Sequence, residues 1–103
     1  MELAVDQEGY LTNLSDWSED AAFTLAAGQG IELNNLHWEV IDTLRQFYAE
    51  TQVAPAMRPL VKLIKQAHGE DKGNSIYLMQ LFGSSPAKTA ALIAGLPRPA
   101  NCL

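Results

Sequence analysis

The sequence predicts a mainly α-helical protein, a small orthogonal bundle of about five helices with a short N-terminal β-hairpin and a flexible C-terminal arm. Apolar residues recur at spacings of three or four in five separate segments, which is the period of one helix face. Glycine, proline or asparagine separates these segments, and these residues commonly start or stop helices. The 103 residues are 48% hydrophobic and 18% charged, so we expect one globular domain with a buried core, covering residues 1–103.

The β-hairpin is expected at the start of the chain. Residues 2–12 read ELAVDQEGYLT, two short apolar segments on either side of a polar turn that contains Gly9. Glycine adopts the backbone angles of a tight turn without steric cost, and short apolar runs around such a turn favour paired strands.

Two helices are expected next. Residues 15–27 carry apolar side chains at helical spacing, and Gly28 with Gly30 supplies a stop. Asn34 is a suitable N-cap for a second helix that extends to about Glu50. This second segment has the most regular apolar spacing of the chain.

Three further helices complete the bundle. Pro55 suits the first turn of the third helix, which Gly69 would end with a left-handed cap. A short fourth helix is expected over residues 74–82. Ser85 and Pro86 then form an N-cap and first-turn pair for the fifth helix.

The fifth helix should end at Gly95, and the last eight residues, 96–103, read LPRPANCL. Two prolines in three residues exclude a helix and favour an extended chain, so we expect a mobile arm. It carries Cys102, the only cysteine, which excludes an intramolecular disulfide and a two-cysteine zinc motif. Since His37 and His68 lie far apart in sequence, we expect no metal and no cofactor.

Charge is divided unevenly along the chain. Residues 1–51 hold ten acids and one base, whereas residues 52–103 hold two acids and six bases, and the total net charge is −5. The negative total disfavours non-specific nucleic-acid binding. A two-sided charge distribution suits docking to a partner with charged faces of its own, although a simply solvated acidic half would have the same composition.

The chain is expected to be cytoplasmic, without a membrane segment. Its longest apolar stretches fall short of the ~20 residues of a membrane-spanning helix. Glu2 and Asp6 interrupt the start of the chain, where a signal peptide carries positive charge.

Four segments resemble one protein family. They read HWEVI at 37–41, GNSIYL at 73–78, PAK at 86–88 and IAGLPRP at 93–99, the last followed by Cys102. They closely resemble the DsrC/TusE family of sulfur-carrier proteins, over nearly the whole chain. The resemblance implies a small helical bundle with a short N-terminal hairpin and a flexible arm, on which the penultimate cysteine carries sulfur as a persulfide.

One position distinguishes the branches of that family. Members that serve dissimilatory sulfite reductase have a second cysteine eleven residues before the penultimate one, and this chain has Ala91 there. The chain therefore looks like the TusE branch. This implies a sulfur relay for tRNA thiouridine synthesis, with an upstream carrier complex of the TusBCD type as donor and the tRNA-thiolating enzyme as acceptor. A DsrC-like partner of sulfite reductase or of sulfur-oxidation enzymes is the alternative.

Either branch implies a sulfurtransferase that works as a carrier rather than as a free-standing enzyme. A persulfide anion is stabilised by nearby cations, and Arg98 is the base nearest to Cys102 in sequence. Further candidates for persulfide stabilisation or partner docking are Lys88 and a stripe at i, i+4 and i+7 of the third helix, namely Arg58, Lys62 and Lys65. Ordinary solvated bases remain the alternative reading for each.

His37 raises a different possibility, since a cysteine and a histidine could form a protease-like pair. Its place beside Trp38 near the start of a helix favours packing or capping, and no oxyanion-hole motif accompanies it. Hydrolysis is therefore not expected.

A helix-turn-helix DNA-binding regulator is the second alternative function, because residues 68–73 join two short helices. The second helix of such a motif reads bases in the major groove. Residues 74–82 contain no arginine or lysine, so this helix has few side chains that could bind the edges of bases. We expect no strong direct binding of nucleic acid.

Overall fold

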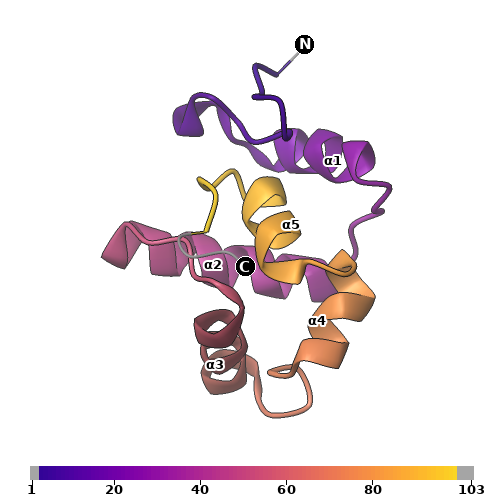
Figure 1. Cartoon of the computed structure of the whole chain (residues 1–103), viewed down its shortest axis with the longest axis vertical. Helices are drawn as coiled ribbons and strands as arrows, with labels where there is room; N and C mark the ends of the chain where they lie inside the picture. Colours follow the sequence, from indigo (N-terminus) through magenta and orange to yellow (C-terminus); the bar gives the residue numbers. More distant parts are fainter. Residues whose placement is uncertain (1–2, 100–103) are drawn as a thin grey trace.

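The computed structural model describes residues 3–99. Figure 1 shows α5 in the middle, with α1 on one side and α3 and α4 on the other, and α5 contacts each of the other four helices. The prediction of a mainly helical fold with about five helices is confirmed. The elements are η1 (Leu14–Asp16), α1 (Glu19–Gly28), α2 (Asn35–Thr51), α3 (Met57–His68), α4 (Ser75–Phe82) and α5 (Pro86–Ile93).

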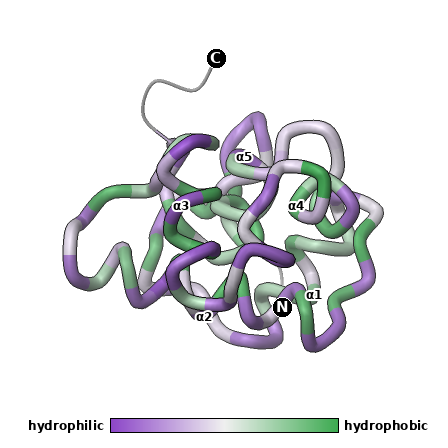
Figure 2. The backbone as a smooth tube through the Cα atoms, turned by 90° about the horizontal axis from the view of Figure 1, so that it is seen from below, coloured by the Kyte–Doolittle hydropathy of each residue, from purple (hydrophilic) through white to green (hydrophobic). Residues whose placement is uncertain are grey.

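The central position of α5 follows from its small side chains. Six of its eight residues are buried, and three of those six are alanines, so neighbouring helices can approach its backbone closely. Larger apolar side chains from α2, α3 and α4 fill the space around it, and they include Val40, Ile41, Leu44, Leu60, Ile64, Leu78 and Phe82. In Figure 2 hydrophobic and hydrophilic colours alternate along the helices, as expected when each buries one face.

His37 is built into the start of α2. The Asn34 side chain accepts the backbone N–H groups of Leu36 and His37, and the Asn34 N–H is 3.1 Å from Nδ1 of the His37 ring. Since Nδ1 accepts, Nε2 carries the proton and donates to the Leu81 carbonyl at 2.8 Å. The capping role predicted for His37 is confirmed, and both ring nitrogens are occupied.

The β-hairpin predicted for residues 2–12 is wrong. Val5 and Leu11 form one isolated antiparallel bridge, and no strand pair is found within residues 3–99. The Asp6 carboxylate closes the turn between them by accepting two of its backbone N–H groups, at 2.9 and 3.1 Å. Pairing cannot extend beyond residue 12, because Asn13 caps the 3-10 turn η1 and redirects the chain.

The first long helix begins later than the sequence suggests. Ser18 is its N-cap and accepts the Ala21 N–H at 3.1 Å, whereas residues 14–16 form η1. Trp17 therefore lies in extended backbone between the two elements. This offset lets its side chain reach the far end of α5.

Gly95 sets the direction in which the chain leaves α5. Its φ of 73° is in the left-handed region, which favours glycine. The Leu96 N–H bonds to the Ala91 carbonyl at 2.9 Å and the Gly95 N–H to the Leu92 carbonyl at 3.2 Å, the pair of bonds that defines a Schellman cap. A Cβ atom at position 95 would overlap the Trp17 indole.

Residues 96–99 are the described part of the predicted arm. Leu96 and Pro99 are buried and Arg98 is exposed, so this segment packs against the rest of the molecule at both of its ends. Cys102 lies outside the described residues. The mobility predicted for residues 96–103 stays a prediction.

We expect Gly95→Ala to destabilise the protein more than Gly30→Ala. Both glycines have nearly the same φ, 73° and 72°, so each substitution bears the left-handed cost of ~1–2 kcal/mol. Only Gly95 is packed against Trp17; nothing lies within 4 Å of a Cβ at Gly30. Overpacking should lower the free energy of unfolding by a further ~1–3 kcal/mol in Gly95→Ala. Urea unfolding measures the difference, and equal losses would contradict the packing role.

Candidate functional site

Arg98 fastens the C-terminal segment to the start of the chain. Its Nε is 3.0 Å from Glu8 Oε2 and its Nη2 is 3.2 Å from Asp6 Oδ2. Its Cζ lies 4.9 Å from the centre of the Tyr10 ring, within the range of a cation–π interaction. We call Arg98 with Asp6, Glu8 and Tyr10 the Arg98 clamp.

The clamp rests on α5. Tyr10 is buried, with 5% of its surface exposed, and its hydroxyl donates to the Lys88 carbonyl at 3.1 Å. The Asp6 carboxylate both orders the turn and binds Arg98. Residues about ninety positions apart in sequence are thereby held beside the first turn of α5.

The charges in the clamp reinforce each other. Desolvation raises the pKa of Asp6, but the backbone N–H groups of Glu8 and Tyr10 and the charge of Arg98 outweigh it and hold that pKa below its ordinary value. Desolvation also lowers the pKa of Arg98, whereas its ion pairs with Glu8 and Asp6 raise it by more. Near neutral pH both Asp6 and Arg98 are therefore ionised.

Two side chains from elsewhere in the chain donate hydrogen bonds to backbone carbonyls at the C-terminal end of α5. Trp17 Nε1 donates to the Ile93 carbonyl at 2.9 Å, and Arg45 Nη1 donates to the Ala94 carbonyl at 2.7 Å. The Arg45 guanidinium also lies 3.7 Å from the centre of the Trp17 ring. Desolvation lowers the pKa of Arg45, but arginine stays charged, and a cation at a helix C-terminus is favourable.

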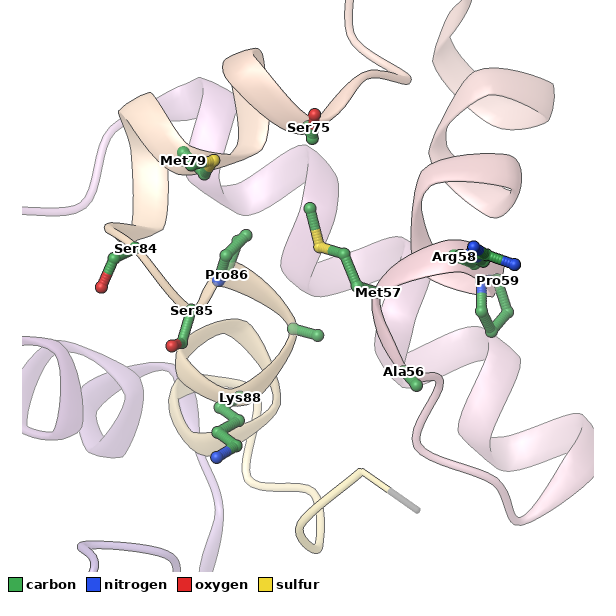
Figure 3. Close-up of a pocket in the computed structure, with 11 residues that line it drawn as sticks. Ala56, Met57, Arg58, Pro59, Ser75, Met79, Ser84, Ser85, Pro86 and Lys88 are labelled. Carbon is green, nitrogen blue, oxygen red and sulfur yellow. The ribbon is translucent and has the colours of Figure 1, made fainter. Parts of the chain in front are cut away.

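Two of the predicted basic residues, Arg58 and Lys88, line one groove. Its volume is about 720 Å³, and Arg58 and Lys88 lie on different helices at its edges (Figure 3). We call it the Lys88 groove. Lys62 and Lys65 are exposed on α3 but do not line it. The groove is lined by Ala56, Met57, Arg58, Pro59, Ser75, Met79, Ser84, Ser85, Pro86, Ala87 and Lys88.

The structure places the other predicted positions apart from this groove. Arg98 belongs to the clamp, and Ala91 is buried in the core with 1% of its surface exposed. Cys102 lies outside the described residues, so its role and that of the basic residues stay predictions. Sequence analysis missed the clamp acids and Arg45, because nothing in a linear sequence pairs residue 98 with residues 6 and 8, or residue 45 with residue 94.

Two negative findings apply to residues 3–99. No group of three or more histidine, cysteine, aspartate or glutamate side chains in this part is placed to hold a metal ion. None of the helices described here has the length and apolar character needed to cross a membrane.

The family model of DsrC-like proteins matches residues 1–103. Sulfurtransferase TusE of Sodalis glossinidius is 52% identical over 102 residues, covering 99% of this chain and 94% of the relative. The Haemophilus influenzae homolog of sulfurtransferase TusE is 50% identical over 103 residues, covering 100% and 94%.

Solved structures are similar throughout the chain. The NMR structure of Allochromatium vinosum DsrC superposes with a TM-score of 0.89 at 47% identity, covering 100% of this chain and 92% of that one. The oxidized γ-subunit of dissimilatory sulfite reductase (DsrC) from Archaeoglobus fulgidus gives 0.85 at 39% identity, covering 100% and 94%. These proteins share the fold over their whole compared length.

The clamp should open in acid. Because the pKa of folded Asp6 lies below its ordinary value of 3.8, its stabilising effect is present above that value and is lost as the pH falls through the folded pKa. We expect the NMR signal of the Arg98 Nη2–H group, which binds Asp6, to shift towards that of a solvated arginine as the pH falls below 3.8. Asp6→Asn should show the shift already at neutral pH, whereas Asp71→Asn should not. An Arg98 signal that is unchanged in Asp6→Asn would contradict the ion pair.

Proposed function

Because this chain belongs to the DsrC-like family and is about half identical to TusE sulfurtransferases, it is a sulfur-relay carrier, and we propose that Cys102 holds the sulfur as a persulfide. Cys102 is the only cysteine of the chain. A carrier that exchanges sulfur between thiols needs one accessible thiolate and no other catalytic group.

The observation that carries this proposal is the way the preceding segment is held. Residues 93–98 are fixed at the cap of α5 by Trp17 and Arg45 and again at the Arg98 clamp. Cys102 follows Arg98 by four residues, which span at most ~14 Å when extended. The segment that precedes the thiol therefore leaves the helical body at a defined point.

The chemistry is thiol exchange. The Cys102 thiolate attacks the terminal sulfur of a donor persulfide, a new S–S bond forms at Cys102 Sγ, and the donor S–S bond breaks with its electron pair leaving on the donor thiolate. The second transfer repeats the step, with an acceptor thiolate as the attacking group and Cys102 as the leaving thiolate. The number of electrons is balanced in both steps, so no external oxidant or reductant is needed.

The basic residues take different parts in this proposal. Arg98 is engaged by two carboxylates, so we assign it to positioning the segment rather than to the persulfide itself. Within residues 3–99, no ion pair involves Arg58 or Lys88, which leaves their charges available to a persulfide anion or a partner. Lys62 and Lys65 are solvated bases on α3 in this scheme.

For the relay itself, we propose tRNA thiolation, with an upstream carrier complex of the TusBCD type as donor and the tRNA-thiolating enzyme as acceptor. Identity to the TusE relatives is 50–52%, against 47% and 39% to the two DsrC structures. Ala91 also occupies the position at which a two-thiol carrier of the sulfite reductase type would need its second cysteine. Both observations favour the TusE reaction over the DsrC one.

Cys102→Ser should abolish sulfur loading and relay. After incubation with a cysteine desulfurase, cysteine and the upstream carriers, intact-mass analysis of the wild type should show the added mass of sulfur on the C-terminal peptide. The variant should show none, because an alcohol does not form the S–S bond. Its unfolding midpoint should match that of the wild type, which separates lost chemistry from lost folding.

Ala91→Ser is the matched control, since it introduces the same hydroxyl at a buried position and leaves the thiol in place. It should keep sulfur loading even if its stability falls. Relay activity that persists in Cys102→Ser would rule out the persulfide on this residue.

A further inference from the structure

The Lys88 groove is a surface feature that the thiol-exchange reaction at Cys102 does not itself require. The first residues of three helices line it, namely Met57 of α3, Ser75 of α4 and Pro86 of α5. Met57 projects into the opening between α3 and α5 in Figure 3. The groove brings two cations, Arg58 and Lys88, together with apolar side chains around a volume of about 720 Å³.

The groove is electropositive in an acidic protein. None of its lining residues is an acid, although the chain has twelve acids and a net charge of −5. Arg58 and Lys88 are both exposed at its edges. The starts of α3 and α5 add partial positive charge, because neither has a side-chain cap hydrogen bond.

The groove is also apolar at its floor and on the α4 side. Met57 and Pro86 lie inside it, and Met79 is 43% exposed beside them. Ile76, three residues before Met79 on the same face of α4, is 69% exposed, the most exposed of the large hydrophobic residues described. Exposed apolar surface framed by charge is typical of protein interaction sites.

We propose that the Lys88 groove is the docking site for a relay partner, and that it receives a protein segment bearing an apolar side chain flanked by carboxylates. The apolar side chain fits beside Met57 and Met79, and the carboxylates meet Arg58 and Lys88. This inference rests on the proposed relay function, because it assigns the groove to the proteins that deliver or accept the sulfur.

The groove is physically connected to the segment that leads to the thiol. The Lys88 carbonyl at its edge accepts the Tyr10 hydroxyl at 3.1 Å, and the same Tyr10 ring underlies Arg98. Lys88, which lines the groove, is therefore in direct contact with Tyr10 of the clamp. Docking there would bring the partner near Arg98, four residues before Cys102 in the sequence.

A nucleic acid is the less suitable occupant. A phosphate backbone would pair with the two cations but would leave Met57, Met79 and Ile76 exposed to water, and ten acids lie in the first half of the chain. The binding experiments below also test whether this groove binds tRNA directly.

The charge test compares two double variants. Arg58→Glu with Lys88→Glu reverses the groove charges, and Lys62→Glu with Lys65→Glu makes the same change in net charge on α3 outside the groove. Using the purified TusBCD-type complex and the tRNA-thiolating enzyme as probes, we expect the groove variant to raise Kd for at least one of them by about tenfold or more. The control should stay within about twofold, and only the groove variant should lose salt dependence.

The apolar test uses Ile76→Ser with Met79→Ser, and Leu36→Ser as its control on another exposed apolar residue. The first should also raise Kd by about tenfold, with helix content by circular dichroism unchanged. Equal affinity of the groove variants and their controls for both probes overturns the proposal. Binding of tRNA alone that is abolished by the groove charge reversal overturns it as well, since the occupant is then RNA.

The outcomes also separate this inference from the proposed function. Binding is measured without sulfur transfer, so relay activity retained by Cys102→Ser would refute the persulfide carrier and leave the groove result standing. Unchanged Kd values in the groove variants, with relay lost in Cys102→Ser, would refute the groove and leave the carrier standing.

Discussion

The C-terminal end of α5 is the constraint on which the rest of the structure depends. Gly95 must adopt a left-handed backbone there, Trp17 covers it, and Arg45 binds the last carbonyl. The cap therefore joins residues from before α1, from α2 and from the end of α5. Each of these elements is itself packed against α5. The cap therefore fixes the direction in which the C-terminal segment leaves α5.

The helices were predictable because their signals are local. Asn34 as N-cap, Ser85 with Pro86 as a start, and Gly69 as a stop all act within one turn of the residues they affect, and α2, α4 and α5 begin where the sequence indicates. Pro55, expected in the first turn of the third helix, lies before it, because α3 begins at Met57 with Ala56 as its N-cap. The start of α1 was misplaced because the helical spacing of apolar residues over 15–27 continues back beyond the cap at Ser18. Packing of Trp17 against Gly95, 78 positions away in the chain, accompanies the later cap.

The candidate site was less predictable, since its contacts are made across the fold. The spacing i, i+4 and i+7 places Arg58, Lys62 and Lys65 on one helical face. Of these three, only Arg58 lines the groove, together with Lys88 from another helix. The Arg98 clamp depends on acids from the opposite end of the chain. In the sequence, only the unequal division of charge between the two halves hinted at this pairing. It does not show which acid pairs with which base.

The two attachments of the C-terminal segment differ in strength for physical reasons. At Gly95 and Leu96 the backbone is buried and hydrogen-bonded, so separating it would expose apolar surface and unpaired carbonyls. At Arg98 the interacting side chains are 39–56% exposed, and water and salt compete with such ion pairs. The ion pairs of Arg98 are therefore the weaker of the two attachments, and the buried cap at Gly95 and Leu96 is the one that holds the start of the segment against α5.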